Sequence, residues 1–105
     1  MTAENARQLA LALPDTTEQD HHGRPSFRVN AKIFATLWDE VTMNVMLDTA
    51  GIRTTVQAHP GWCSERYWGQ RLAAVSVALP GAPERELVEI LSDAWETKAG
   101  RRPFR

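Results

Sequence analysis

Three histidines and one cysteine are the side chains best suited to metal binding or nucleophilic chemistry. His21 and His22 are adjacent, whereas His59 and Cys63 are four residues apart, a spacing that could supply two metal ligands from one helix. A proline and a glycine lie between His59 and Cys63, so these two residues cannot share a helix turn. We therefore predict no metal site and no cofactor.

Cys63 could also act as a nucleophile if His59 or His22 lay beside it in space. A reactive thiol needs partial exposure and a nearby cation, which Arg66 could provide. The flanking tryptophans instead indicate packing, and the sequence has no Gly-rich phosphate loop, paired catalytic carboxylates or serine elbow. We predict a buried, unreactive Cys63, no catalytic residues and no enzyme. An enzyme that uses Cys63 and a histidine is a third hypothesis.

Aromatic and basic residues alternate in the segment GWCSERYWGQR. Trp68 with Arg66 and Arg71 has the chemistry that base stacking and phosphate contact require. The same composition is typical of an aromatic loop packed against a core. Both interpretations stay open from the sequence alone.

A second basic group lies in the segment DHHGRPSFRV and just after it. Arg24, Arg28 and Lys32 have no acidic residue among them. Gly23 and Pro25 are expected to set a turn from which the arginines project. We expect His22 to order this loop rather than to transfer protons.

Length and composition limit the function classes. A chain of 105 residues is predicted to form one domain, 1–105. The formal net charge of −1 argues against strong, sequence-independent binding of nucleic acid, although a basic patch can exist on a neutral protein. Three features predict a cytoplasmic protein without membrane contact. The chain has a single cysteine, it has no apolar run long enough to span a bilayer, and its N-terminus is unlike a signal peptide.

Hydrophobic periodicity predicts three helices and four strands in the order α-β-β-β-α-β-α. This order indicates an α+β fold in which helices cover one face of an antiparallel sheet. The helices are expected over about 3–13, 49–58 and 83–98, three strands within 26–47 and the fourth over 72–79.

The connection between the first two predicted strands decides which residues face the core. A three-residue loop, 30–32, keeps apolar residues on one face and turns Phe34 and Trp38 outward. A two-residue turn of Asn30 and Ala31 would instead place Ile33 beside Arg28, so hydrophobic patterning favours the longer loop. The predicted core comprises Leu9, Leu13, Phe27, Val29, Ile33, Ala35, Leu37, Val41, Met43, Val45, Val75, Val77, Leu87, Leu91 and Trp95.

Segments spread over nearly the whole chain resemble the MmcQ/YjbR family. HHGRPSFRVNAKIFATL is similar to that family's G-R-P-x-F-R-V segment and following strand, and YWGQRLAAVSVAL to its W-G-x-R segment and last strand. ELVEILSDAWETKAGRR resembles its closing helix, and ALALP fits its opening helix. One departure is Ala73-Ala74, which stand where many relatives carry a glycine and a large aromatic residue.

The resemblance implies a bacterial protein with a frataxin-like (CyaY-like) fold and DNA binding through a double-wing pair of hairpins. Iron binding of the frataxin kind would need an acidic ridge. The candidate acids of the last helix are interrupted by Arg85 and resemble a solvated face. They are Glu84, Glu86, Glu89, Asp93 and Glu96.

We therefore expect a non-enzymatic binding module that contacts DNA weakly and in a salt-dependent way. Its expected contact residues are Arg24, Arg28, Lys32, Arg66, Trp68 and Arg71. The alternative is a module that binds a protein or small molecule through an aromatic sheet face containing Phe34, Trp38 and Trp68. A continuous basic strip on the surface favours the first hypothesis, and a deep apolar pocket favours the second. Either module is expected to be a monomer or a weak dimer.

Overall fold

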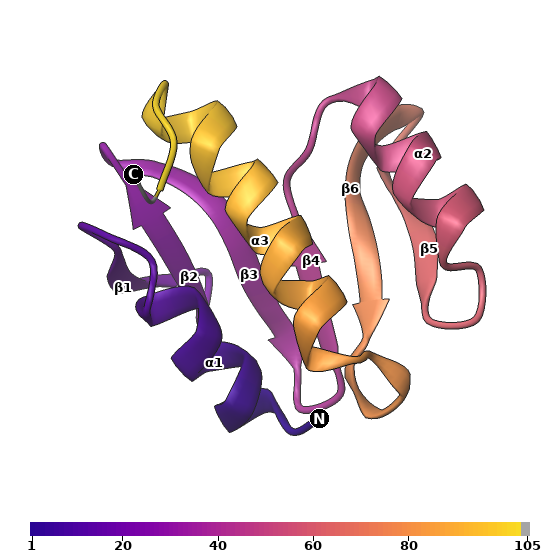
Figure 1. The fold of residues 1–105 in the computed structure, drawn as a ribbon, viewed down its shortest axis with the longest axis horizontal. Coiled ribbons are helices and arrows are strands. Elements are labelled where there is room, and N and C mark those ends of the chain that lie inside the picture. Colours follow the sequence, from indigo (N-terminus) through magenta and orange to yellow (C-terminus); the bar gives the residue numbers. More distant parts are fainter. Residues whose placement is uncertain (104–105) are drawn as a thin grey trace.

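The computed structural model describes residues 1–103, which form three α-helices, six β-strands and one 3₁₀ turn. Figure 1 shows their arrangement. The elements in chain order are α1 (Ala3–Leu11), β1 (Thr17–His21), β2 (Arg24–Val29), β3 (Lys32–Asp39), β4 (Thr42–Val45), α2 (Thr49–Ala58), β5 (Cys63–Trp68), β6 (Arg71–Ala78), η1 (Leu79–Gly81) and α3 (Glu84–Ala99).

The six strands form one antiparallel sheet with the order β1-β2-β3-β4-β6-β5. The three helices lie on the same face of this sheet, with α1 and α3 over β2, β3 and β4, and α2 over β5 and β6 (Figure 1). The opposite face, which we call the outer face, carries no helix in the described part of the chain. The predicted α+β class, with helices on one face, is confirmed.

Two strands, β1 and β5, are absent from the predicted order. They are the two edges of the sheet, and their sequences, TEQDH and CSERYW, place almost every side chain in solvent. A strand that buries nothing has no hydrophobic alternation to reveal it. The interpretation of the segment around Arg66 and Trp68 as a loop was therefore wrong, because these residues lie on β5.

The predicted register between β2 and β3 was also wrong. Asn30 and Ala31 form a two-residue turn with φ values of 52° and 63°, and Arg28 pairs with Ile33. Positive φ at both turn residues is the geometry that matches the twist of a tight hairpin. A β-bulge then leaves Phe34 without a partner on β2, because Phe27 pairs with Ala35.

This bulge reconciles the short turn with a continuous core. Phe34 and Ala35 are both fully buried against the helices, whereas Ile33 is only half-buried on the outer face. A bulge redirects side chains in this way because two residues of one strand oppose a single residue of the other. Phe34 is thus a core residue and Ile33 is not, the reverse of the expectation.

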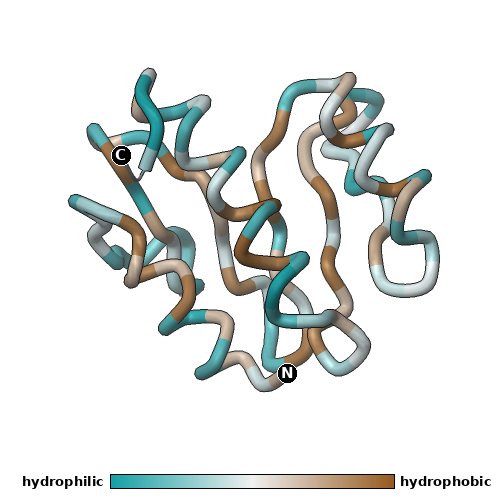
Figure 2. Tube along the Cα trace, in the orientation of Figure 1, coloured by the Kyte–Doolittle hydropathy of each residue, from teal (hydrophilic) through white to brown (hydrophobic). Residues whose placement is uncertain are grey.

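Most residues of the predicted core are buried, although the observed core also contains residues outside that set, such as Ile52 and Leu79. Figure 2 shows hydrophobic residues recurring along the central strands and the helices. Trp95 of α3 is fully buried, and its indole Nε1 donates a hydrogen bond of 2.9 Å to the carbonyl of Pro14. Leu9 is half-buried and packs on the edge of the core. Val41 was predicted in the core but is 52% exposed, because it lies in the turn between β3 and β4.

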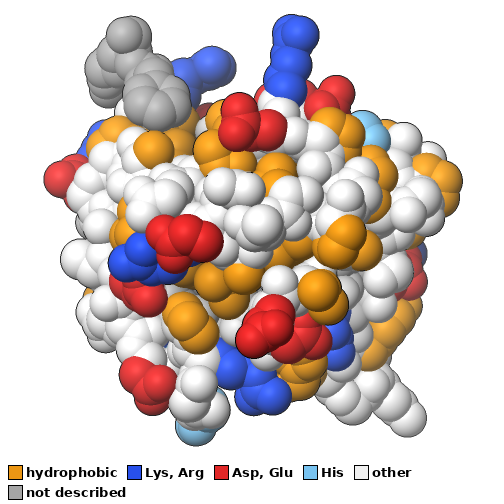
Figure 3. Space-filling view, turned by 90° about the horizontal axis from the view of Figure 1, so that it is seen from below, with side chains coloured by type: hydrophobic (Ala, Val, Ile, Leu, Met, Phe, Trp, Pro, Cys, Tyr) orange, Lys and Arg blue, Asp and Glu red, His pale blue; other side chains and the backbone are white. Residues whose placement is uncertain are grey.

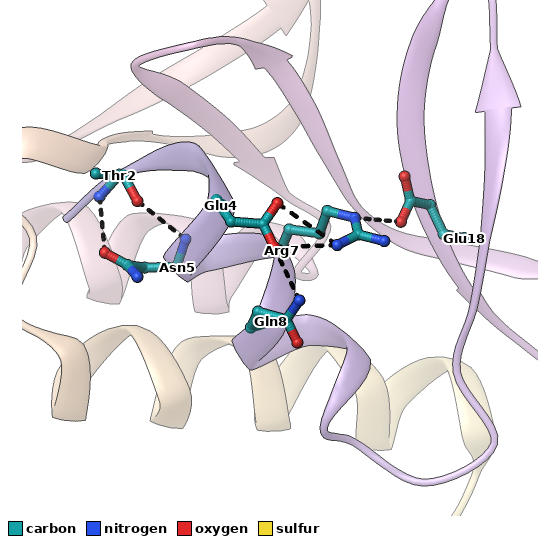
Figure 4. A network of polar contacts seen from close by, with 6 residues as sticks. All are labelled: Thr2, Glu4, Asn5, Arg7, Gln8 and Glu18. Atoms are coloured by element: carbon teal, nitrogen blue, oxygen red, sulfur yellow. Dashed lines mark hydrogen bonds and ion pairs between the residues drawn. The ribbon is translucent and has the colours of Figure 1, made fainter.

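Polar contacts fix α1 to the first edge strand (Figure 4). The hydroxyl of Thr2 accepts a hydrogen bond from the amide of Asn5, whose side chain accepts one from the amide of Thr2, a capping box. Arg7 donates to Glu18 of β1 at 2.6 Å and pairs with Glu4 at 3.1 Å. The Arg7–Glu18 ion pair thus joins α1 to β1, whose own side chains are all exposed.

Candidate functional site

A row of polar side chains crosses the outer face of the sheet. The strand register aligns Ser26 with Thr36, Thr36 with Asn44, and Asn44 with Ser76. Ser26, Thr36 and Asn44 are nevertheless buried, at 0%, 6% and 1% exposure. Because no helix covers this face in the described range, the larger side chains around the row must shield it.

Those side chains enclose a cavity of about 500 Å³, within the range typical of sites for small molecules. β3 and β4 form its floor. The β1–β2 hairpin reaches it from one side and the β5–β6 hairpin from the other, so both edges of the sheet contribute. The lining residues are His21, His22, Arg24, Ile33, Thr36, Trp38, Asn44, Met46 and Trp68.

The carboxamide of Asn44 is the most unusual group in this cavity. Neither its Nδ2 nor its Oδ1 has a hydrogen-bond partner among the described residues, although both atoms are buried. A buried polar group without a partner costs about 1–3 kcal/mol, which is why such groups are rare in native proteins. The amide thus holds one acceptor and two donors just beneath the cavity floor, where an occupant reaches them only if the side chains over Asn44 move aside.

The cavity wall contains a tryptophan with two arginines stacked on it. The guanidinium of Arg24 lies 3.7 Å from the ring centroid of Trp38, and Arg24 Nε donates to the Trp38 carbonyl at 2.9 Å. The guanidinium of Arg66, from β5, lies 4.9 Å from the same ring. These cation–π contacts bring together two residues from opposite ends of the predicted site.

The outer face collects most, but not all, of the predicted DNA-contacting residues. Arg28 donates to the buried hydroxyl of Ser26 at 3.1 Å, and Arg71 pairs with Trp68 at the end of the β5–β6 hairpin. Lys32 is exposed and pairs with the core residue Val29, so the register directs it toward the helix-covered side. The structure therefore brings five of the six residues to one face and separates Lys32 from them.

The histidines lie at the tip of the β1–β2 hairpin, at the rim of the cavity. Their ring centroids are 4.5 Å apart, and His22 and Gly23 form the turn with φ values of 54° and 84°. The side chain that orders this turn is Asp20, which accepts a hydrogen bond of 3.2 Å from the amide of Gly23. The loop-ordering role expected of His22, which lies within the turn, stays a prediction. Pro25 was misassigned to the turn, because it lies within β2.

Cys63 and His59 lie away from this cavity. Cys63 is buried, as predicted, and burial raises the pKa of its thiol to about 11. The ring of His59 packs on Trp62 at 4.6 Å. Among the described residues, no cluster of three or more histidine, cysteine or acidic side chains could hold a metal ion.

Charges of both signs are mixed on the side of the molecule that Figure 3 shows. In this view, Lys and Arg side chains lie among Asp and Glu side chains and form no continuous basic strip. On α3, burial and the neighbouring carboxylates of Glu96 and Glu89 raise the pKa of Asp93. No helix of the described range is long and apolar enough to cross a membrane.

Comparison with known proteins assigns the family. The family model named YjbR matches residues 11–97, most of the chain. The chain belongs to the YjbR family. The crystal structure of Deinococcus radiodurans protein DR2400, described as a DUF419 domain, has the same fold with a TM-score of 0.75. Their sequences are 23% identical, and the match covers 94% of this chain and 80% of that one. No curated protein matched the chain.

Sequence reasoning missed the residues that give this YjbR-family chain its cavity. Thr36 and Asn44 occupy the outward positions of alternating strands, where polar residues are ordinarily solvated, so nothing in the sequence indicated that they are buried. Ile33 faces the cavity because of the turn and bulge before Ala35, and Met46 reaches the cavity just after the end of β4. The unusual feature visible in the sequence was an asparagine between two apolar residues, Met43 and Val45.

Proposed function

We propose that this YjbR-family protein is a non-enzymatic binding module whose outer-face cavity accepts a small molecule. The observation that carries the proposal is the buried amide of Asn44, which has no partner among residues 1–103, at the floor of a mostly apolar cavity of about 500 Å³. A few polar groups within an apolar concave surface are typical of ligand sites. The alternative hypothesis, a module with an aromatic binding face, thus has more support than DNA binding, with Phe34 removed from that face.

The protected state of Cys63 supports a binding role. The Cys63 thiol is buried with a raised pKa, and the histidines at the cavity rim belong to the opposite edge hairpin. A thiol with this pKa stays protonated at neutral pH and is a poor nucleophile. Binding without chemistry is therefore the function that we propose.

The test uses 1-anilinonaphthalene-8-sulfonate, a fluorescent aromatic sulfonate that reports apolar cavities. We expect saturable binding by the folded protein at one site and at least a fivefold weaker affinity in Trp68→Ala. Tyr67→Ala is the matched control, because Tyr67 and Trp68 are adjacent and similarly exposed, at 47% and 46%, but only Trp68 lines the cavity. Equal effects of the two substitutions, or no saturable binding, would contradict the proposal.

DNA binding is the second candidate function, and it has one favourable observation. Arg24, Arg28, Arg66 and Arg71 share the outer face with Trp68. Four phosphate contacts on duplex DNA predict a slope of about −3.6 in a plot of log binding constant against log salt concentration.

Fluorescence anisotropy with labelled duplex DNA tests this candidate at salt concentrations from low to physiological. Replacing Arg28 and Arg71 by alanine should reduce the slope by about 1.8, whereas Lys32→Ala should leave it unchanged. No binding at low salt would exclude the candidate. An effect of Lys32 equal to that of one arginine would place the site elsewhere.

A further inference from the structure

The amide at the cavity floor limits the chemistry of a ligand. Asn44 can donate from Nδ2 and accept at Oδ1 at the same time, and both atoms are buried without a protein partner in the described range. Once the side chains over Asn44 move aside, one ligand group can satisfy both atoms if it carries an acceptor and a donor side by side on a rigid edge. The edges of nucleobases have this pattern, and asparagine reads adenine through such a bidentate contact.

The walls around Asn44 select a flat ring. Trp68 is 46% exposed and lines the cavity from one hairpin, while Ile33 and Met46 add apolar surface. An exposed indole can stack on any nucleobase, whichever base it is, because every base has a π-face. The planar guanidinium of Arg24, already stacked on Trp38, adds a second flat surface.

The cations around the cavity favour an anionic substituent on that ring. In residues 1–103 the recorded ion pairs involve Arg7 and Arg101, and neither Arg24 nor Arg66 takes part in one. Arg24 also lines the cavity, and its terminal nitrogens remain available beyond the Nε bond to Trp38. Guanidinium groups bind phosphate oxygens well because their planar donors match that geometry.

We infer that the cavity binds the nucleobase of a nucleoside monophosphate, with its base edge on Asn44, its ring against Trp68 and its phosphate near Arg24. This inference rests on the proposed function and names the ligand class for the same cavity. The depth of Asn44 requires the base to stand outside a helical stack, so a duplex cannot supply it without flipping the base. A free mononucleotide and an unstacked base of a single strand present the same chemistry.

Titrations followed by ¹⁵N–¹H NMR and calorimetry test the inference with adenosine 5′-monophosphate and phenyl phosphate. Phenyl phosphate supplies a ring and a phosphate but no donor–acceptor edge. We expect the nucleotide to bind at least tenfold more tightly than phenyl phosphate in the wild type. In Asn44→Leu this preference should fall below twofold, whereas Ser76→Ala should retain it. Ser76 is the matched control because it pairs with Asn44 across β4 and β6 but does not line the cavity.

A second variant keeps the test informative if Asn44→Leu does not fold. Trp68 is exposed, so Trp68→Ala should fold and should weaken both ligands at least fivefold, while Tyr67→Ala should not. Titration with oligo(dA) then distinguishes a free mononucleotide from an unstacked base of a single strand. A single strand that binds at least tenfold more tightly per site than the mononucleotide identifies nucleic acid, and equal affinity identifies the free nucleotide.

Either source supports the inference, and two results would overturn it. The first is the absence of nucleotide binding at millimolar concentration in a protein that binds 1-anilinonaphthalene-8-sulfonate, which leaves the proposed function standing. The second is an undiminished preference for the nucleotide in Asn44→Leu. Failure of both the dye and the nucleotides would instead remove the proposed function itself.

Discussion

The two faces of the sheet are built from alternate residues of the same strands, yet they differ in what covers them. On β4, Met43 and Val45 point toward the helices and are fully buried, while Asn44 between them points to the outer face. The helix-covered face is closed by α1, α2 and α3. In residues 1–103 the outer face is covered by side chains of the strands and of the residues just beside them.

The consequence is a division of roles between stability and binding. The helix-covered face contains close-packed apolar side chains, which supply most of the favourable free energy of folding. The outer face retains a buried amide that costs stability and an exposed indole that contributes little. Proteins keep such unfavourable features where function needs them. The predictions below test whether the two faces differ in this way.

The largest difference should appear between two tryptophans. Trp95 is fully buried on the helix-covered side and also donates a hydrogen bond to Pro14, whereas Trp68 lies half-exposed on the outer face. Trp95→Ala should lower the free energy of unfolding by about 3–5 kcal/mol. Trp68→Ala should change it by less than about 1 kcal/mol. Urea denaturation of both variants measures this, and similar losses would contradict the division between the faces.

The thiol of Cys63 gives a pH-dependent test on the helix-covered side. Burial raises its pKa to about 11, so the folded state holds the proton more tightly than the unfolded chain does. The stabilisation is complete below the unfolded pKa of about 8.5 and disappears as pH rises through the folded value. At about 1.4 kcal/mol per pKa unit, we expect a loss of roughly 2–3 kcal/mol by pH 11.

The control for this loss is Cys63→Ala, which lacks the titrating group. Stability curves of the two proteins from pH 7 to pH 11 should converge or cross as the wild type loses its contribution. A constant difference over that range would show that the folded thiol is not protected. Slow alkylation of the folded protein at neutral pH, compared with the urea-unfolded chain, gives an independent reading of the same burial.

Replacing the buried amide should produce a smaller effect of opposite sign. Asn44→Leu has nearly the same shape and removes two polar atoms that have no partner in the described part of the chain. We expect the free energy of unfolding to rise by about 1–2 kcal/mol, because the desolvation penalty of those atoms disappears. Ser76→Ala on the adjoining strand should change it by less than about 0.5 kcal/mol. A clear loss of stability in Asn44→Leu would show that the amide is satisfied within the protein.

The same difference between faces explains which features could be predicted from the sequence. The amphipathic helices and the alternation of β3, β4 and β6 follow from burial on the helix-covered face, so the fold class was predicted correctly and most residues of the predicted core are buried. The edge strands β1 and β5 bury almost nothing and gave no such pattern. The outer-face cavity depends on side chains from both edges, so it could not be predicted once those strands were missed.

Phe34 shows why hydrophobic patterning predicted the wrong register between β2 and β3. Patterning assumes unbroken alternation, and under that assumption a two-residue turn would have turned the core face of β3 outward. The structure combines the short turn with a bulge at Phe34, so β3 has a tight turn and still buries its apolar residues against the helices. Arg24, Arg66 and Trp68 were correctly selected by residue type, but their meeting at Trp38 required the three-dimensional arrangement.

The smallest predicted effect concerns the turn that assigns β3 residues to their faces. Ala31 adopts a φ of 63°, a left-handed conformation that costs an alanine about 1–2 kcal/mol. Glycine adopts it freely, but loses more chain entropy on folding, which offsets part of the gain. Ala31→Gly should therefore raise the free energy of unfolding by about 0.5–1 kcal/mol in urea denaturation.

Asn30 provides the matched control because it has a φ of 52° in the same turn. Asparagine tolerates this conformation, and the Asn30 side chain also donates a hydrogen bond of 3.3 Å to the carbonyl of Ala99. Asn30→Gly should thus give no gain or a small loss. If Ala31→Gly destabilised the protein as much as Asn30→Gly, the turn would not have this geometry. The assignment of Ile33 to the cavity and of Phe34 to the core would then lose its physical basis, because both follow from the two-residue turn and the bulge after it.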